Sequence, residues 1–75
     1  MVVSCRTIEM EVGADSEAIG KTLKEVRLPR SVMVAGIIRG GESFIPHGDT
    51  EIMIDDDLIL ITLPDAVHAV ERVFG

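Results

Sequence analysis

Residues 7–12 alternate between polar and apolar side chains. The apolar members of this segment, which would share one side of a strand, are Ile8, Met10 and Val12. A period of two residues is that of a strand with one buried face. The pattern therefore predicts a half-buried strand that ends at Gly13.

A helical period follows this strand. Apolar side chains recur at the spacing of one helix face, at Ile19, Leu23 and Val26. Asp15 and Ser16 precede them as candidate N-caps, because their side chains can accept hydrogen bonds from the first amides of a helix. The segment is therefore predicted to form a short amphipathic helix that reaches about Val26. A glycine inside a helix costs about 1 kcal/mol relative to alanine, so Gly20 indicates close packing of the backbone at that point.

The longest apolar run, residues 32–38, has the length of a strand and predicts burial on both faces. Gly40 and Gly41 follow it, and they can supply the positive φ angles of a two-residue hairpin loop. A short strand is then predicted at residues 43–45. Pro46 ends this strand because it lacks an amide donor.

Two more strands and a helix complete the pattern. The strands are predicted at residues 51–54 and 58–63, with an acidic turn at residues 55–57 between them. A terminal helix is predicted to begin at Pro64 and Asp65, with Asp65 as its N-cap. The predicted order is β-α-β-β-β-β-α, which gives an α+β fold class with a small mixed or antiparallel sheet and two helices on one face.

Composition narrows the choice of partners. The 75 residues are enough for one small domain over residues 1–75. Seven basic residues stand against 13 acidic ones, a net charge of −6, and the only aromatic residues are two Phe. A nucleic-acid surface needs clustered cations or stacking side chains, so we expect no nucleic acid as partner. The run at residues 32–38 is far shorter than the roughly 18 residues of a membrane span, so we expect no direct insertion into a membrane.

Size and apolar content together predict self-association. Apolar residues make up 47% of the chain, whereas a domain of this size buries only about 60% of the surface that its unfolded chain exposes. We therefore predict a homodimer, with residues 32–38 or their neighbours near the interface. The single Cys5 and the lack of a signal-peptide pattern favour a cytoplasmic location.

No pattern in the sequence predicts catalysis or a metal site. The candidate nucleophiles and bases, which no motif brings together, are Ser4, Cys5, His47 and His68. The carboxylates of residues 49–57 lack the spacing of a calcium-binding loop, so a solvated acidic turn is favoured. Cations recur every three residues on the predicted helix and beyond it, at Lys21, Lys24, Arg27 and Arg30. They are predicted to form a solvated face, with docking of an acidic partner or a phosphate as the alternative.

Five short segments in a fixed order resemble one known family. They are Gly20-Lys21-Thr22-Leu23, Leu28-Pro29, Ile38-Arg39-Gly40-Gly41, Ile45-Pro46-His47-Gly48-Asp49-Thr50 and Asp56-Asp57-Leu58-Ile59-Leu60. Their order and spacing resemble the C-terminal subdomain of regulators of potassium conductance, also called TrkA-C, from about Ile8 to Phe74. That family usually has glycine where this chain has Asp55. Aspartate tolerates left-handed backbone angles better than most residues, so the turn is expected to survive.

The resemblance implies a cytoplasmic regulatory module that binds a ligand, dimerises and biases the gating of a potassium or other cation transport system, without catalysis. Such modules commonly accompany a Rossmann-like domain and a membrane transporter subunit, and some bind cyclic di-adenosine monophosphate between two copies. The glycine motif of a dinucleotide-binding domain is absent from this chain. The alternative is a purely structural dimerisation domain of a transporter or transcription regulator, with no ligand.

A candidate ligand site lies at and after the predicted hairpin. Its residues are Arg39, Phe44, Pro46 and His47. A guanidinium can hold a phosphate by two hydrogen bonds, Phe and Pro offer apolar surface to a purine, and His can donate a hydrogen bond. We predict that any cyclic di-adenosine monophosphate or adenine nucleotide binds here. The alternative is that Arg39 is a surface residue beside a turn and that Phe44 belongs to the core.

Overall fold

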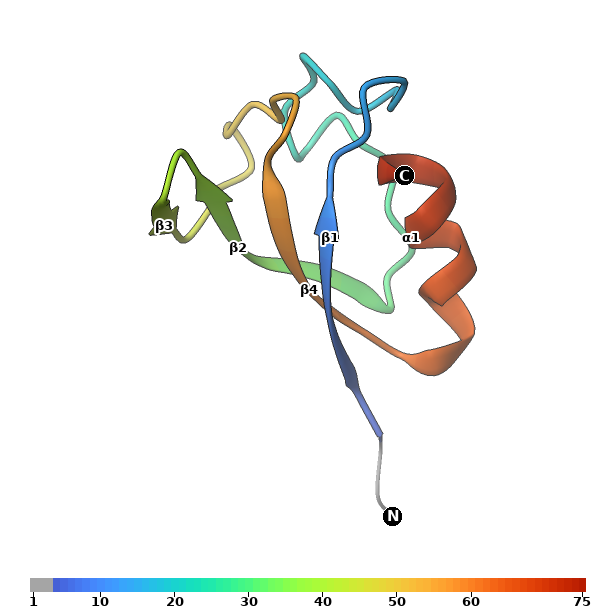
Figure 1. Cartoon of the computed structure of the whole chain (residues 1–75). Coiled ribbons are helices and arrows are strands. Elements are labelled where there is room, and N and C mark those ends of the chain that lie inside the picture. Colours follow the sequence, from blue (N-terminus) through green and yellow to red (C-terminus); the bar gives the residue numbers. More distant parts are fainter. Residues whose placement is uncertain (1–3) are drawn as a thin grey trace.

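The computed structural model describes residues 4–75 and shows a four-stranded sheet followed by one helix (Figure 1). The elements are, in chain order, β1 (Arg6–Glu11), β2 (Val32–Arg39), β3 (Glu42–Phe44), β4 (Asp57–Thr62), the 3-10 turn η1 (Pro64–Ala66) and α1 (Val67–Phe74). All neighbouring strands are antiparallel, in the order β1-β4-β2-β3. The predicted α+β class with a small antiparallel sheet is confirmed.

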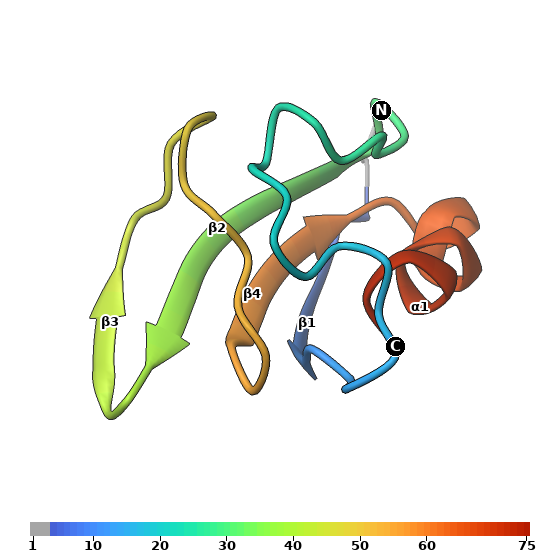
Figure 2. The same ribbon diagram turned by 90° about the horizontal axis from the view of Figure 1, so that it is seen from above.

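One face of the sheet carries the core. The segment 13–30 and α1 pack on this face, and Figure 2 shows them from above. The core consists of Val12, Ala18, Val26, Ile37, Ile52, Leu58, Leu60, Val70 and Phe74. Alternate residues of β4 point into it, and α1 adds two side chains that are spaced by four residues and therefore share one side of the helix. The alternation predicted for β1 is also confirmed, since its apolar side packs against this core.

The prediction of a helix that reaches Val26 is wrong. Turns replace it, because its backbone groups bond to residues 48–52: the Gly20 amide donates to the Ile52 carbonyl at 2.9 Å, and the Leu23 amide donates to the Thr50 carbonyl at 3.0 Å. Gly20 has a φ of +84°, which no right-handed helix accommodates. The predicted close packing at Gly20 is wrong as well, since a Cβ atom there would meet nothing within 4 Å.

Two other predicted elements differ from the structure. The strand expected at residues 51–54 is reduced to a single bridge between Thr22 and Glu51. The terminal helix is preceded by η1, and Leu63 rather than Asp65 occupies the position before that turn, with no side-chain cap. Among residues 4–75, one α-helix and not two therefore covers the sheet, and the segment 13–30 takes the place of the other.

The predicted hairpin joins β2 to β3. Arg39 pairs with Glu42 and leaves Gly40 and Gly41 as the loop. Their φ angles are +59° and +83°, and a type I′ turn requires both to be positive. The hairpin places Phe44 opposite Ile37, two residues before Arg39, so the Arg39 and Phe44 side chains share the core side of the sheet at one end.

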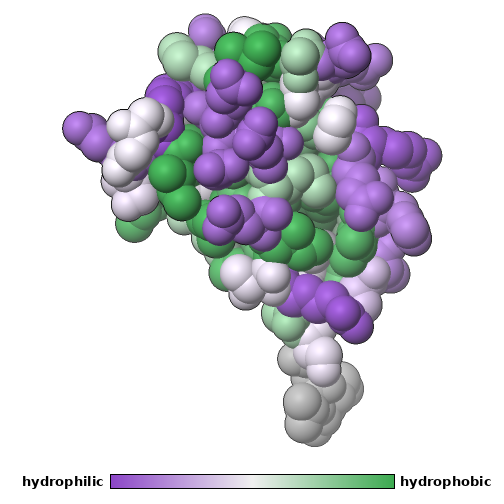
Figure 3. All heavy atoms as spheres, in the orientation of Figure 1, coloured by the Kyte–Doolittle hydropathy of each residue, from purple (hydrophilic) through white to green (hydrophobic). Residues whose placement is uncertain are grey.

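The other face of the sheet has no cover among the residues described. Its apolar side chains on β2 and β4, which we call the open face, are Met33, Ile38, Ile59 and Ile61. None of them belongs to the core or packs against it, and Met33 is 56% exposed. The prediction that residues 32–38 are buried on both faces is therefore wrong for the single chain, which buries Ile37 but leaves Met33 exposed. In Figure 3, hydrophobic surface lies between charged side chains over the strands, whereas the side that carries α1 is largely hydrophilic.

Candidate functional site

Arg39, at the end of β2, is held by a buried carboxylate. Its Nε donates to Oδ1 of Asp56 and its Nη2 to Oδ2, both at 2.8 Å, which is a two-pronged ion pair. Nη2 also donates to the carbonyl oxygen of Glu51 at 2.9 Å. The Asp56 side chain is 1% exposed and that of Arg39 is 33% exposed. The guanidinium therefore covers the carboxylate and keeps one edge in solvent.

The turn at residues 53–56 brings Asp56 to this position. The Asp56 amide donates to the Met53 carbonyl at 3.2 Å, and the Met53 amide donates to Oδ2 of Asp56 at 2.9 Å. Between them, Asp55 has a φ of +67°. The expectation that Asp55 keeps this turn in place of the family's glycine is confirmed. Within this turn, the Asp56 carboxylate thus accepts a hydrogen bond from the Met53 amide in addition to those from Arg39.

Opposing effects act on the pKa of Asp56. Burial raises that pKa, but the hydrogen bonds from Arg39 and the Met53 amide, together with the positive charge of Arg39, outweigh burial and hold the pKa of Asp56 below its usual value of 3.8. The carboxylate is therefore ionised at neutral pH. The Arg39–Asp56 pair is a charged pair that joins the end of β2 to the start of β4.

Phe44 lies under the guanidinium. The centre of its ring is 5.1 Å from Cζ of Arg39, within the range of a cation–π contact. The ring is half-buried and packs against the core. The sequence analysis gave two alternatives for Phe44: a core residue, or an apolar surface for a bound purine. The structure gives it core contacts on one side and Arg39 on the other.

The other two candidate residues follow β3. Pro46 is half-buried, and the His47 side chain is exposed. The His47 backbone is fixed by a turn, in which its amide donates to Oγ1 of Thr50 at 2.9 Å and its carbonyl accepts from the Thr50 amide at 3.1 Å. The exposed ion pair of Lys24 with Asp49, at 2.6 Å, lies beside this turn. No hydrogen bond or ion pair among residues 4–75 joins the His47 side chain to Arg39, and His47 lies five residues after Glu42, which pairs with Arg39 in the hairpin. We refer to the four candidate residues, Arg39, Phe44, Pro46 and His47, as the Arg39 corner.

The chemistry open to the Arg39 corner is anion binding. Within residues 4–75, Nη1 of Arg39 makes no hydrogen bond, so its two N–H groups can face a phosphate while Nε and Nη2 stay on Asp56. The residue that sequence reasoning missed is Asp56. Arg39 is the only Lys or Arg between residues 32 and 64, and six carboxylates lie in the same interval. This imbalance indicates an ion pair but does not identify the partner of Arg39.

Neither a metal centre nor a membrane helix is found in the described residues. No three or more His, Cys, Asp or Glu side chains in residues 4–75 are grouped to hold a metal ion. Over the same residues, no helix has both the length and the apolar character to cross a membrane. Cys5 is a free thiol at the surface.

Comparison with known proteins places this geometry in context. The family model of the TrkA-C domain matches residues 7–75. The Trk system potassium uptake protein TrkA homologue of Archaeoglobus fulgidus is 35% identical over 60 residues, which cover 80% of this chain and 14% of that protein. The TrkA homologue 2 of Methanosarcina mazei is 31% identical over 68 residues, which cover 91% of this chain and 15% of that protein. The chain thus spans a small part of these curated relatives.

The fold itself has a solved counterpart. A structure described as "Structure of RCK domain with cda" superposes with a TM-score of 0.81, over 92% of this chain and 97% of that one. The two sequences are 23% identical, so the likeness establishes the shared fold.

Proposed function

This chain belongs to the TrkA-C family of domains, and on that premise we propose that it is a cytoplasmic regulatory module of a potassium or other cation transport system. The module binds a small ligand and dimerises, and it performs no catalysis. Two of its relatives are Trk system potassium uptake proteins, which supports the link to potassium transport. Its partners in the full system are a Rossmann-like domain and a membrane transporter subunit.

The Arg39 corner carries the proposal of a ligand. It places a cation that has two free N–H groups over the ring of Phe44, and the exposed His47 follows three residues after Phe44. An anionic ligand with a flat apolar part, such as cyclic di-adenosine monophosphate or an adenine nucleotide, suits this combination. The structural neighbour described with cda supports a ligand in this fold.

The ligand would act through the Arg39–Asp56 pair. A phosphate at Nη1 competes with Asp56 for the same positive charge, and this pair joins β2 to the 53–56 turn and β4. A ligand that binds one arrangement of the two protomers better than another shifts the equilibrium between them by the ratio of its two affinities. Domains tethered to the module would pass that shift to the gate.

The ligand is tested best at His47, because Arg39 also holds the fold. Calorimetric titration of cyclic di-adenosine monophosphate and of ATP into His47→Ala is expected to show affinity for the binding nucleotide about fivefold to tenfold weaker than wild type, the loss of one hydrogen bond. The matched control is His68→Ala, which removes the other exposed histidine, on α1. Equal weakening in both variants would place the ligand elsewhere. No binding to wild type would favour the structural dimerisation domain instead.

The open face is the proposed dimer interface. Its apolar side chains lie on the two central strands. A second copy packed on this face would cover them, so that both faces of the sheet would then be buried. Met33→Lys is expected to convert the dimer to a monomer at micromolar concentration in sedimentation equilibrium, because it places a charge in that interface. Ile54→Lys is the control: Ile54 is 52% exposed, close to the 56% of Met33, but lies in the 53–56 turn. A monomeric wild type, or a Met33→Lys dimer of unchanged strength, would contradict the proposal.

A further inference from the structure

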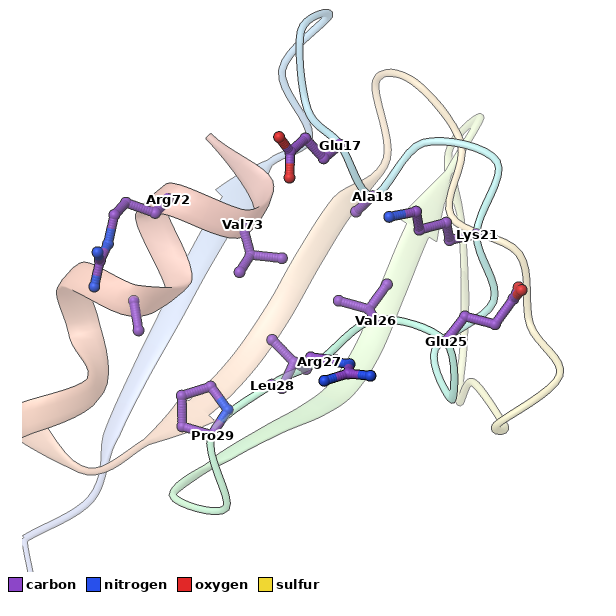
Figure 4. Close-up of a pocket in the computed structure, with 11 residues that line it drawn as sticks. Glu17, Ala18, Lys21, Glu25, Val26, Arg27, Leu28, Pro29, Arg72 and Val73 are labelled. Carbon is purple, nitrogen blue, oxygen red and sulfur yellow. The ribbon is translucent and has the colours of Figure 1, made fainter.

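A cavity of about 620 Å³ lies between α1 and the segment 17–29 (Figure 4). Its residues are separate from those of the Arg39 corner. Val73 points into it from α1, and Val26 and Leu28 face it from the opposite wall. This volume is in the usual range of small-molecule sites, roughly 300–1,000 Å³.

The charges around the cavity are unusual for this protein. Three of the seven basic residues line it: Lys21, Arg27 and Arg72. In contrast to Lys24 and Arg39, these three form no ion pair within residues 4–75. Figure 4 shows Lys21 and Arg27 on the wall opposite α1, while Arg72 extends outward from the helix. Free cations thus gather around an apolar floor in a chain whose net charge is −6.

The two carboxylates that line the same cavity cancel only part of this charge. Glu25 keeps its negative charge, because its Oε1 accepts from the Thr22 amide at 2.8 Å and from the Thr22 hydroxyl at 2.9 Å, and these bonds lower its pKa. Glu17 is the remaining acidic side chain. Three cations against two carboxylates leave a net charge of +1 on the lining, and none of the three cations forms an ion pair within residues 4–75. An occupant with a negative group and an apolar body would satisfy both features.

We propose that this cavity is a second binding site, for a small organic anion. The apolar body of the ligand lies against Val26, Leu28 and Val73, and its carboxylate, sulfonate or phosphate group lies between Lys21 and Arg27. Two of the four periodic cations, Lys21 and Arg27, thus take the role of binding an anion, which was the alternative to a solvated face. This site is independent of the Arg39 corner and of the proposed ligand there.

The test uses 8-anilinonaphthalene-1-sulfonate, an aromatic anion, in a fluorescence titration of the folded wild-type protein. We expect saturable binding of this sulfonate. N-phenyl-1-naphthylamine has the same aromatic body without the sulfonate, and we expect it to bind about tenfold more weakly. Amide shifts in a heteronuclear NMR spectrum should concentrate at residues 17–29 and 69–73. Shifts concentrated at residues 39–47 or on the open face would overturn the proposal, and so would a lack of binding.

Variants separate the cavity from general surface binding. Lys21→Gln with Arg27→Gln should weaken binding of the sulfonate about tenfold and leave binding of the neutral analogue unchanged. Arg30→Gln, a neighbouring cation that does not line the cavity, is the matched control and should bind as wild type does. Ala69→Phe should fill the space and abolish binding of both compounds, with Ala14→Phe as its control. Equal affinity in the double variant and in Arg30→Gln would overturn the proposal whether or not Ala69→Phe folds.

Discussion

Replacing Arg39 by methionine is expected to lower the free energy of unfolding by about 3 kcal/mol at pH 7, the low end of what breaking a buried ion pair costs. Methionine keeps much of the apolar stem but leaves the Asp56 carboxylate, 1% exposed, with the Met53 amide as its remaining donor. A denaturant titration measures the loss. In a domain of this size that loss is a large part of the total stability.

A second substitution identifies the cause. Asp56→Asn removes the buried charge but keeps an oxygen for the Met53 amide, so the double variant Arg39→Met/Asp56→Asn should be more stable than Arg39→Met alone. Lys24→Ala breaks the other ion pair, whose side chains are 66% and 84% exposed, and should change stability by less than about 1 kcal/mol. A double variant no more stable than Arg39→Met would show that lost packing, and not the stranded charge, causes the effect.

Acid provides the same test without a mutation. The pKa of Asp56 is lower in the folded chain than its usual 3.8, so this group contributes stability that is present above about pH 4 and disappears as the pH falls through the folded-state pKa. The free energy of unfolding of the wild type should therefore fall more steeply below about pH 4 than that of Asp56→Asn. Parallel curves would contradict a charged pair.

Replacing Gly40 and Gly41 together by valine should cost about 2–4 kcal/mol of unfolding free energy, since left-handed backbone costs an ordinary residue about 1–2 kcal/mol and a β-branched residue no less. The cause is backbone strain and not collision, because a Cβ atom at either position would meet nothing within 4 Å. Chemical denaturation compared with the wild type measures it.

The matched control keeps the turn and adds a side chain. Gly40→Asn gives the Asn-Gly sequence that type I′ turns favour, and it should change stability by less than about 0.5 kcal/mol. Loss of stability in Gly40→Asn as large as in the valine variant would mean that the loop tolerates no side chain at all. Unchanged stability in the valine variant would show that the hairpin does not depend on this turn.

The sequence allowed the sheet to be predicted better than the connections. β1, β2 and β4 have clear patterns because each buries one side against the core, and the Gly40–Gly41 loop has a local requirement that two glycines satisfy. Residues 15–26 have a helical period, yet their amides bond to residues 48–52. That pairing is a tertiary interaction, which local periodicity does not record. The period still identified Val26 as buried.

Part of the candidate site could likewise be predicted from the sequence, and part could not. The residues of the Arg39 corner were chosen for their chemistry, and the hairpin brings Arg39 and Phe44 into contact because their positions on paired strands share one side. The choice of Asp56 among the neighbouring acids depends on the 53–56 turn and its left-handed Asp55. The cavity beside α1 is lined by residues about 50 positions apart in sequence, so no local sequence pattern predicts it.

The pairing of β1 with β4 determines when this domain can fold. Arg6 lies opposite Thr62, and the Gly13 amide donates to the carbonyl of Phe74 at 3.0 Å, so the first strand is completed by the last quarter of the chain. Contacts between such distant residues form slowly, because a long loop must close before they yield any stability. During synthesis on the ribosome, β2 would leave the exit tunnel well before its neighbour β4. Its apolar side chains then remain uncovered until residues 57–74 have emerged, so the sheet can close only after that segment leaves the tunnel.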